Sequence, residues 1–341
     1  MSLILPTDPG LIRNGPAAEP TDISRFWPWC MLALCGLVSA VLMARAELTI
    51  DPWSPSNFPY YAAVALVLTL KARPVQRMLP YGKAIADAGT YFLIFTAIAL
   101  LGAATSYPIA AMSHGYADAT LQRIDGMLGF DWLAWYRLVA AHPVLQWLGI
   151  GAYESIYVTP AVLLGWFAFY DERAAANRFL ASFWLAAAVT LALFSLMPAV
   201  GPFAYLWHGP IPYMPRSELW QPDLIPQLRA HAVHIIDLGQ LRGLVSAPSF
   251  HAAAAAIYLV TAWRIPPLRW VLVPLNGAML LATPVEGTHY LADIILGIGV
   301  AAGAIAVGSL LIQTPGRAGD AQPRQSRTAD SSSWGRKGLA R

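Results

Sequence analysis

The chain has 341 residues, of which 57% are apolar and only 12% are charged. Soluble domains carry roughly a quarter charged residues, so this composition excludes an ordinary soluble protein and indicates an integral membrane protein. The net charge of +3 is small and the basic residues are spread along the chain, which argues against a nucleic-acid partner.

In chain order, eight apolar segments are long enough, or nearly so, to cross a bilayer. The predicted fold is therefore an all-α polytopic membrane protein with about eight transmembrane helices. The predicted segments are residues 26–44, 57–70, 88–112, 143–170, 178–197, 249–264, 269–286 and 288–312.

Three other features bear on the ends and the connections. The sequence "ARA" at 44–46 resembles a signal-peptide cleavage site, so cleavage of the first segment is an alternative to a first transmembrane helix. Residues 117–141 mix Trp, Tyr and Arg with apolar residues, which fits either a helix lying in the membrane interface or a connecting helix packed on the bundle. Cys30 and Cys35 fall inside the first apolar run, so neither a disulfide nor a zinc site is expected.

The distribution of Lys and Arg predicts the orientation. With a cytoplasmic N-terminus and eight spans, 16 of the 22 basic residues lie on inner segments and six on outer ones. Basic residues concentrate on cytoplasmic segments, so both termini are predicted to be inside, in a bacterial inner (plasma) membrane.

Two histidines are predicted to meet at the outer surface. The sixth segment begins outside at "SAPSFHAAAAA" and the eighth begins outside with "THYLAD". Between His251 and His289 the chain crosses inward through 16 residues and returns through 18, or roughly 24 and 27 Å at the helical rise. Legs of matched length return the chain to the same membrane face.

Asp293 follows His289 by four residues, so the two are expected on one face of the eighth helix. A carboxylate that accepts from one ring nitrogen fixes the tautomer and leaves the other nitrogen for nucleophilic or base catalysis. His251 can then protonate a leaving group. The alternatives are an ordinary interfacial histidine and a structural His–Asp hydrogen bond.

Ser249 is expected to cap the sixth helix, because it precedes the apolar run directly. Backbone N–H groups at 250–252, together with the helix dipole, would attract a phosphate. The alanines that follow allow neighbouring helices to approach closely. The alternative is that Ser249 is a cap and nothing more.

These residues resemble two motifs of the type 2 phosphatidic acid phosphatase superfamily, the membrane lipid phosphatases related in fold to vanadium haloperoxidases. Pro248, Ser249 and His251 match its Pro-Ser-x-His motif, and His289 and Asp293 match its His-x-x-x-Asp motif. The "AT" at 282–283 before "THYLADIILG" looks most like the inositol phosphorylceramide synthase-like branch, which transfers head groups between lipids. The likeness covers roughly residues 115–312.

The resemblance implies a helical core like that of lipid phosphatases and haloperoxidases. It also implies that His289 becomes a phosphohistidine, oriented by Asp293, while His251 is the general acid. No cofactor and no metal are implied. The expected organisation is a cytoplasmic N-terminal segment (1–25), accessory transmembrane helices (26–112), a catalytic membrane domain (113–312) and a disordered basic tail (313–341).

The sequence departs from the family in its positive charges. The first motif, a Lys followed by Arg-Pro, has no match near the outer end of the fifth segment, and Thr283 stands where most members have Arg. Phosphoryl transfer needs donors for spread negative charge. Arg242 is our first candidate for this role and Arg216 the second, and either could instead face lipid head groups.

Two acidic residues are further candidates. Glu154 lies within the fourth segment and could line an acyl-chain cleft, contact a polar substrate or bond to a neighbouring helix. Glu286 could shape an acceptor pocket or cap the eighth helix.

The predicted function is a lipid phosphoesterase or phosphotransferase that works at the periplasmic face on a lipid phosphate in the bilayer. The Ala-Thr variant and the long 198–248 loop favour an inositol-type phosphotransferase. The alternatives are a plain lipid phosphate or polyprenyl diphosphate phosphatase and, from another class, a proton-coupled transporter. The sequence leaves the lipid, the acceptor and the oligomeric state open.

Overall fold

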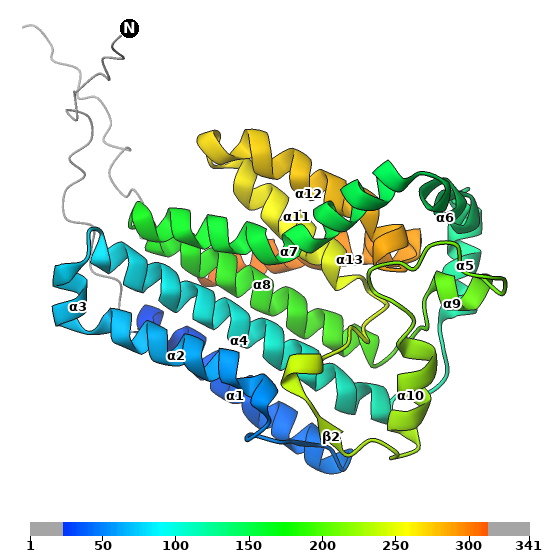
Figure 1. The fold of residues 1–341 in the computed structure, drawn as a ribbon, viewed down its shortest axis with the longest axis horizontal. Helices are drawn as coiled ribbons and strands as arrows, with labels where there is room; N and C mark the ends of the chain where they lie inside the picture. Colours follow the sequence, from blue (N-terminus) through cyan, green and yellow to red (C-terminus); the bar gives the residue numbers. More distant parts are fainter. Residues whose placement is uncertain (1–22, 313–341) are drawn as a thin grey trace, which may run out of the picture. The chain divides into compact units, whose positions relative to one another are not determined.

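All eight predicted apolar segments form helices in the computed structural model, which describes residues 23–312 (Figure 1). The predicted tail, and nearly all of the predicted N-terminal segment, lie outside the described residues. The long apolar helices are α1 (Ile23–Arg45), α2 (Phe58–Lys71), α4 (Gly82–Met112), α7 (Pro143–Phe169), α8 (Arg173–Phe194), α11 (Phe250–Trp263), α12 (Pro266–Glu286) and α13 (Leu291–Leu311).

Six of these helices are long and apolar enough to cross a membrane, which fits an integral membrane protein. The other two, α2 and α11, have 14 residues each, or roughly 21 Å at the helical rise. That is shorter than the roughly 30 Å hydrocarbon core of a bilayer. The chain nevertheless runs back and forth through all eight helices, as the predicted orientation requires (Figure 1).

The main apolar core lies between the long helices of the second half and α4. Its largest fully buried members include Phe183 and Tyr258, and Phe95 stacks against Phe183 with ring centroids 4.3 Å apart. The alanines Ala252–Ala255 are fully buried where α11 contacts α7, α8, α12 and α13. Small side chains let these backbones approach closely, as the sequence predicts.

The shorter helices gather mostly at one end of the long ones (Figure 1). They are α5 (Asp118–Met127), α6 (Trp132–Ala141), α9 (Pro202–Leu206) and α10 (Gln221–Arg229), whereas α3 (Arg73–Met78) lies at the opposite end. Trp132 and Tyr136 are buried, and the Trp132 indole donates to the Pro284 carbonyl at 2.7 Å. Of the two alternatives for residues 117–141, this burial favours connecting helices packed on the bundle.

Two predicted helix starts were displaced. Helix α8 begins at Arg173 rather than 178, because its polar first turn carries no hydropathy signal. Helix α13 begins at Leu291 rather than 288, because Thr288 has a left-handed φ of 49° that a right-handed helix cannot include. His289 therefore lies just before α13 rather than on its face.

A short pairing joins the accessory helices to the long 198–248 loop. Strand β1 (Thr49–Ile50), after α1, pairs in parallel with β2 (Ile235–Ile236), with Thr49 opposite Ile235. The 3-10 turns η1 (Pro55–Asn57) and η2 (Leu238–Gln240) lie beside it. A second apolar cluster beneath the pairing holds Met43, Leu48, Phe194, Ile225, Ile236 and Leu244.

Candidate active site

The two histidines of the matching motifs come together. His251 is the second residue of α11 and His289 precedes α13, and their ring centroids are 6.5 Å apart. Both belong to the end of the bundle where α5, α6 and α9 gather (Figure 1). A phosphoryl group between two imidazoles at this separation can be reached from both sides.

Asp293 holds His289 in a fixed orientation. Its Oδ1 lies 3.0 Å from Nδ1 of His289, and neither atom has another partner among the described residues. Its Oδ2 accepts from the Tyr290 N–H at 2.9 Å and so caps α13. Because Nδ1 faces Asp293, Nε2 is the ring nitrogen that is left for a reaction.

The loop before α13 brings the His289 ring close to the backbone. A side-chain carbon at Gly287 would meet Cδ2 of His289 at 2.5 Å and Nε2 at 3.2 Å. No side chain fits there unless the ring moves. Gly287 therefore helps to define where the reactive nitrogen lies.

Tyr153 of α7 orients His251. The two rings stack with centroids 4.1 Å apart and planes 12° apart, and the Tyr153 hydroxyl lies 3.2 Å from Nδ1 of His251. The contact limits the ring to one position. Sequence reasoning missed Tyr153, because a tyrosine within an apolar helix carries no signal of what it faces.

Ser249 performs the predicted capping role and also joins the two motifs. Its Oγ accepts from the Ala252 N–H at 3.2 Å, and its own N–H donates to the Asp293 carbonyl at 3.1 Å. The N–H groups of Phe250 and His251 have no partner among the described residues. They are the donors that an anion at this helix start would meet.

Gly297 permits the close approach of α13 to α11. A side-chain carbon built there would collide with the Ser249 carbonyl oxygen, whereas one at Gly299 would have nothing within 4 Å. The spacing of the two helices, and with it the spacing of the histidines, therefore depends on the absence of a side chain at Gly297.

Two carboxylates of α5 hold this region together, and sequence reasoning did not single them out. Asp118 accepts from the N–H groups of Val200 and Gly201, each at 3.0 Å, and from the Tyr290 hydroxyl at 2.9 Å. Burial raises the pKa of the Asp118 carboxyl, and these hydrogen bonds offset part of that rise.

Asp125 binds the start of α13 directly. It accepts from the N–H groups of Leu291 at 3.0 Å and Ala292 at 2.8 Å. Burial raises the pKa of this carboxyl as well. Only an accurate placement of α5 against α13 could have identified either aspartate.

The remaining sequence candidates are engaged elsewhere in the protein. The Arg242 guanidinium stacks on Trp220 at 3.8 Å from the ring centroid. The Thr283 hydroxyl is buried and donates to the Met279 carbonyl one turn earlier in α12. The structure brings neither of them to the two histidines.

Arg216 pairs with Glu154, the residue after Tyr153. Its backbone N–H donates to Glu286 at 3.1 Å, three residues before His289. Arg216 is thus connected to both histidine stretches. The pairing also decides between the alternatives for Glu154, which contacts the 198–248 loop and not a neighbouring helix.

Glu286 anchors the 198–248 loop rather than capping α13. Its Oε1 accepts from the Tyr213 hydroxyl at 2.7 Å, and its carbonyl accepts from the Ser217 N–H at 2.9 Å. Burial and the Glu286 carboxylate raise the pKa of Tyr213. Among residues 23–312, no group of three or more His, Cys, Asp or Glu side chains is arranged to hold a metal ion.

Comparison with known proteins gave one match. A family model described as the PAP2 superfamily matches residues 119–307, which is 189 of the 341 residues. The match includes both histidines and Asp293. Searches of curated proteins and of solved structures found no significant match.

Proposed function

The chain belongs to the PAP2 superfamily, and we propose that it is a membrane lipid phosphotransferase that acts through a phosphohistidine at His289. Membership supports a lipid phosphatase-like function in a bilayer. The observation that carries the mechanism is the pair of imidazoles 6.5 Å apart, one of them 3.0 Å from a buried carboxylate.

In the first step, Nε2 of His289 attacks phosphorus and the bond from phosphorus to the lipid oxygen breaks. His251, in its protonated form, gives its proton to that oxygen, so the leaving group departs as an alcohol. Asp293 stabilises the positive charge that His289 acquires. In the second step, water or an acceptor hydroxyl attacks phosphorus, His251 takes its proton, and the bond to His289 breaks.

Arg216 is the side chain we assign to the phosphate, in place of the family's missing first motif. Its side chain is 55% exposed and its one charged partner, among the described residues, is Glu154. A phosphate can compete for such an exposed pair at small cost, because exposed ion pairs contribute only about 0–1 kcal/mol. Arg242 is the weaker assignment, because its guanidinium stacks on Trp220.

The acceptor decides between a transferase and a hydrolase. The Ala-Thr pair at 282–283 and the anchored 198–248 loop support an inositol-type transfer, in which a sugar-like hydroxyl attacks the phosphohistidine. Water can use the same three side chains, so a plain lipid phosphatase is the second candidate. We place the reaction at the periplasmic face of a bacterial inner membrane, because Lys and Arg concentrate at the opposite end.

The test uses the purified full chain in vesicles, with phosphatidic acid, a polyprenyl diphosphate, and phosphatidylinositol plus a lipid acceptor as separate substrates. We expect phosphate release or head-group exchange, lowered about 10⁴-fold or more in His289→Ala. His142→Ala is the matched control, since His142 is an exposed histidine at the start of α7. Trapping a radiolabelled, acid-labile phosphohistidine in the wild type would support the covalent step.

Full turnover in His289→Ala would overturn the mechanism. Exchange without phosphate release supports the transferase, and release without exchange supports the hydrolase. Proton flux in the wild type, with neither reaction on any of these substrates, would instead support a transporter.

A further inference from the structure

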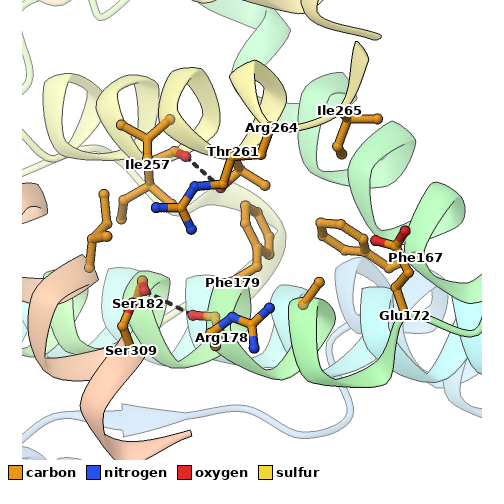
Figure 2. Close-up of a pocket in the computed structure, with 13 residues that line it drawn as sticks. Phe167, Glu172, Arg178, Phe179, Ser182, Ile257, Thr261, Arg264, Ile265 and Ser309 are labelled. Atoms are coloured by element: carbon orange, nitrogen blue, oxygen red, sulfur yellow. Dashed lines mark hydrogen bonds between the residues drawn. The ribbon is translucent and has the colours of Figure 1, made fainter. Parts of the chain in front are cut away.

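A cavity lies at the end of the bundle opposite the histidines. It has a volume of about 180 Å³ and lies between the end of α7, the start of α8 and the ends of α11 and α13 (Figure 2). His251 and Arg264 belong to the two ends of α11, 13 residues or roughly 20 Å apart. The cavity is therefore separate from the catalytic site.

Two arginines from different helices line this cavity. Figure 2 shows the guanidinium groups of Arg178, from α8, and Arg264, from α11, entering the space from opposite sides. Neither forms an ion pair among the described residues. Glu172 also lines the cavity, but Figure 2 places its carboxylate beside Phe167, away from both guanidinium groups.

The other basic residues nearby have partners within the chain. Arg173 and Lys83 both pair with Asp171, and the Arg269 guanidinium lies 5.0 Å from the ring centroid of Trp270. The hydroxyls of Ser182, Thr261 and Ser309 add polar atoms to the cavity walls. Two positive charges without a counter-ion, next to hydroxyl groups, are an arrangement that attracts an anion.

Exposed aromatic residues place the cavity at the level of lipid head groups. Trp263, Trp270 and Tyr170 are 62%, 76% and 53% exposed and lie next to the elements that form it. Trp and Tyr concentrate at the two membrane–water interfaces. Apolar lining residues such as Phe179, Ile257 and Ile305 continue from the arginines toward the membrane interior.

We propose that this cavity binds the phosphate head group of an anionic phospholipid, held by Arg178 and Arg264, in the leaflet opposite the catalytic histidines. The volume suits a head group and not a whole lipid, since pockets that enclose a small molecule measure roughly 300 Å³ or more. Basic pockets between transmembrane helices on the cytoplasmic side characteristically bind anionic head groups. The proposal does not depend on the phosphotransfer mechanism.

The experiment measures the phospholipid that stays with the purified full chain. The protein is exchanged from vesicles of phosphatidylglycerol and phosphatidylcholine into detergent, and each retained lipid is quantified by mass spectrometry. We expect Arg178→Gln and Arg264→Gln each to lower phosphatidylglycerol retention about fivefold, the effect of about 1 kcal/mol per basic residue, with little change for phosphatidylcholine. Arg269→Gln is the matched control, because it removes a charge at the same end outside the cavity.

Further arms separate the alternatives. His289→Ala should retain phosphatidylglycerol like the wild type even if the protein is inactive, so this result is independent of the catalytic proposal. Equal losses in Arg264→Gln and Arg269→Gln would overturn the site. So would full displacement of the lipid by millimolar inorganic phosphate, because the cavity would then be a free-phosphate site. If a glutamine variant fails to fold, Arg178→Lys with Arg264→Lys should still retain the lipid.

Discussion

Replacing Gly297 with alanine tests the link between helix spacing and chemistry. The added carbon would lie well inside van der Waals contact with the backbone carbonyl oxygen of Ser249, which no side-chain rotation relieves. Helices α11 and α13 must then separate by on the order of 1 Å at this level. His251 and His289 are carried on these two elements, so their rings must also shift.

The expected size of the effect follows from that shift. Overpacking of this kind costs about 1–3 kcal/mol of stability, and a misplacement of about 1 Å can lower a rate about 100-fold. Alanine also favours a helix over glycine by about 1 kcal/mol, whatever its position. Gly299→Ala carries that gain without the collision, because nothing lies within 4 Å of its added carbon.

The assay compares both variants with the wild type for turnover of the lipid substrate and for thermal unfolding in detergent. We expect Gly297→Ala to lose about 100-fold in turnover and to unfold earlier, while Gly299→Ala keeps its activity. Wild-type turnover in Gly297→Ala, or the same loss in both variants, would refute the argument that helix contact sets the histidine spacing.

Tyr153→Phe keeps the ring stacked on His251 but removes the hydroxyl 3.2 Å from Nδ1, so turnover should fall about tenfold at unchanged thermal stability; an unchanged rate would show that stacking alone is sufficient. Asp118 predicts a pH effect. Its folded pKa is raised above 3.8, so the folded state binds the proton more tightly and stability falls as pH rises through that window. Asp118→Asn cannot titrate, so unfolding curves over a pH series should show a flatter dependence above 3.8; an unaltered slope would contradict this.

The helices could be predicted from the sequence because a bilayer demands long apolar runs, and each run formed a helix. Their ends were less predictable. The start of α8 at Arg173 lies in a polar turn, and the start of α13 depends on Thr288, Asp293 and Asp125, residues from two distant parts of the chain. Only a folded structure brings such capping groups together.

The candidate site divides in the same way. His251, His289 and Asp293 could be predicted because their spacing and the matched helix lengths place them at one face. Tyr153 and Asp118 could not, because they act across helix contacts that no local pattern encodes. The ranking of the arginines depended on the 198–248 loop, whose path is fixed by bonds such as that from Tyr213 to Glu286.

The small parallel pairing between Thr49–Ile50 and Ile235–Ile236 has a consequence for where this protein can be cut. The family match begins at residue 119, yet one strand of the pairing, and the apolar floor that Met43 and Leu48 provide, come from before it. A fragment trimmed to the matched region would leave Ile236 and Leu244 facing solvent and the loop that carries Arg216 without its support. The first two helices therefore work as a built-in brace, and engineering of a minimal enzyme from this chain has to keep them.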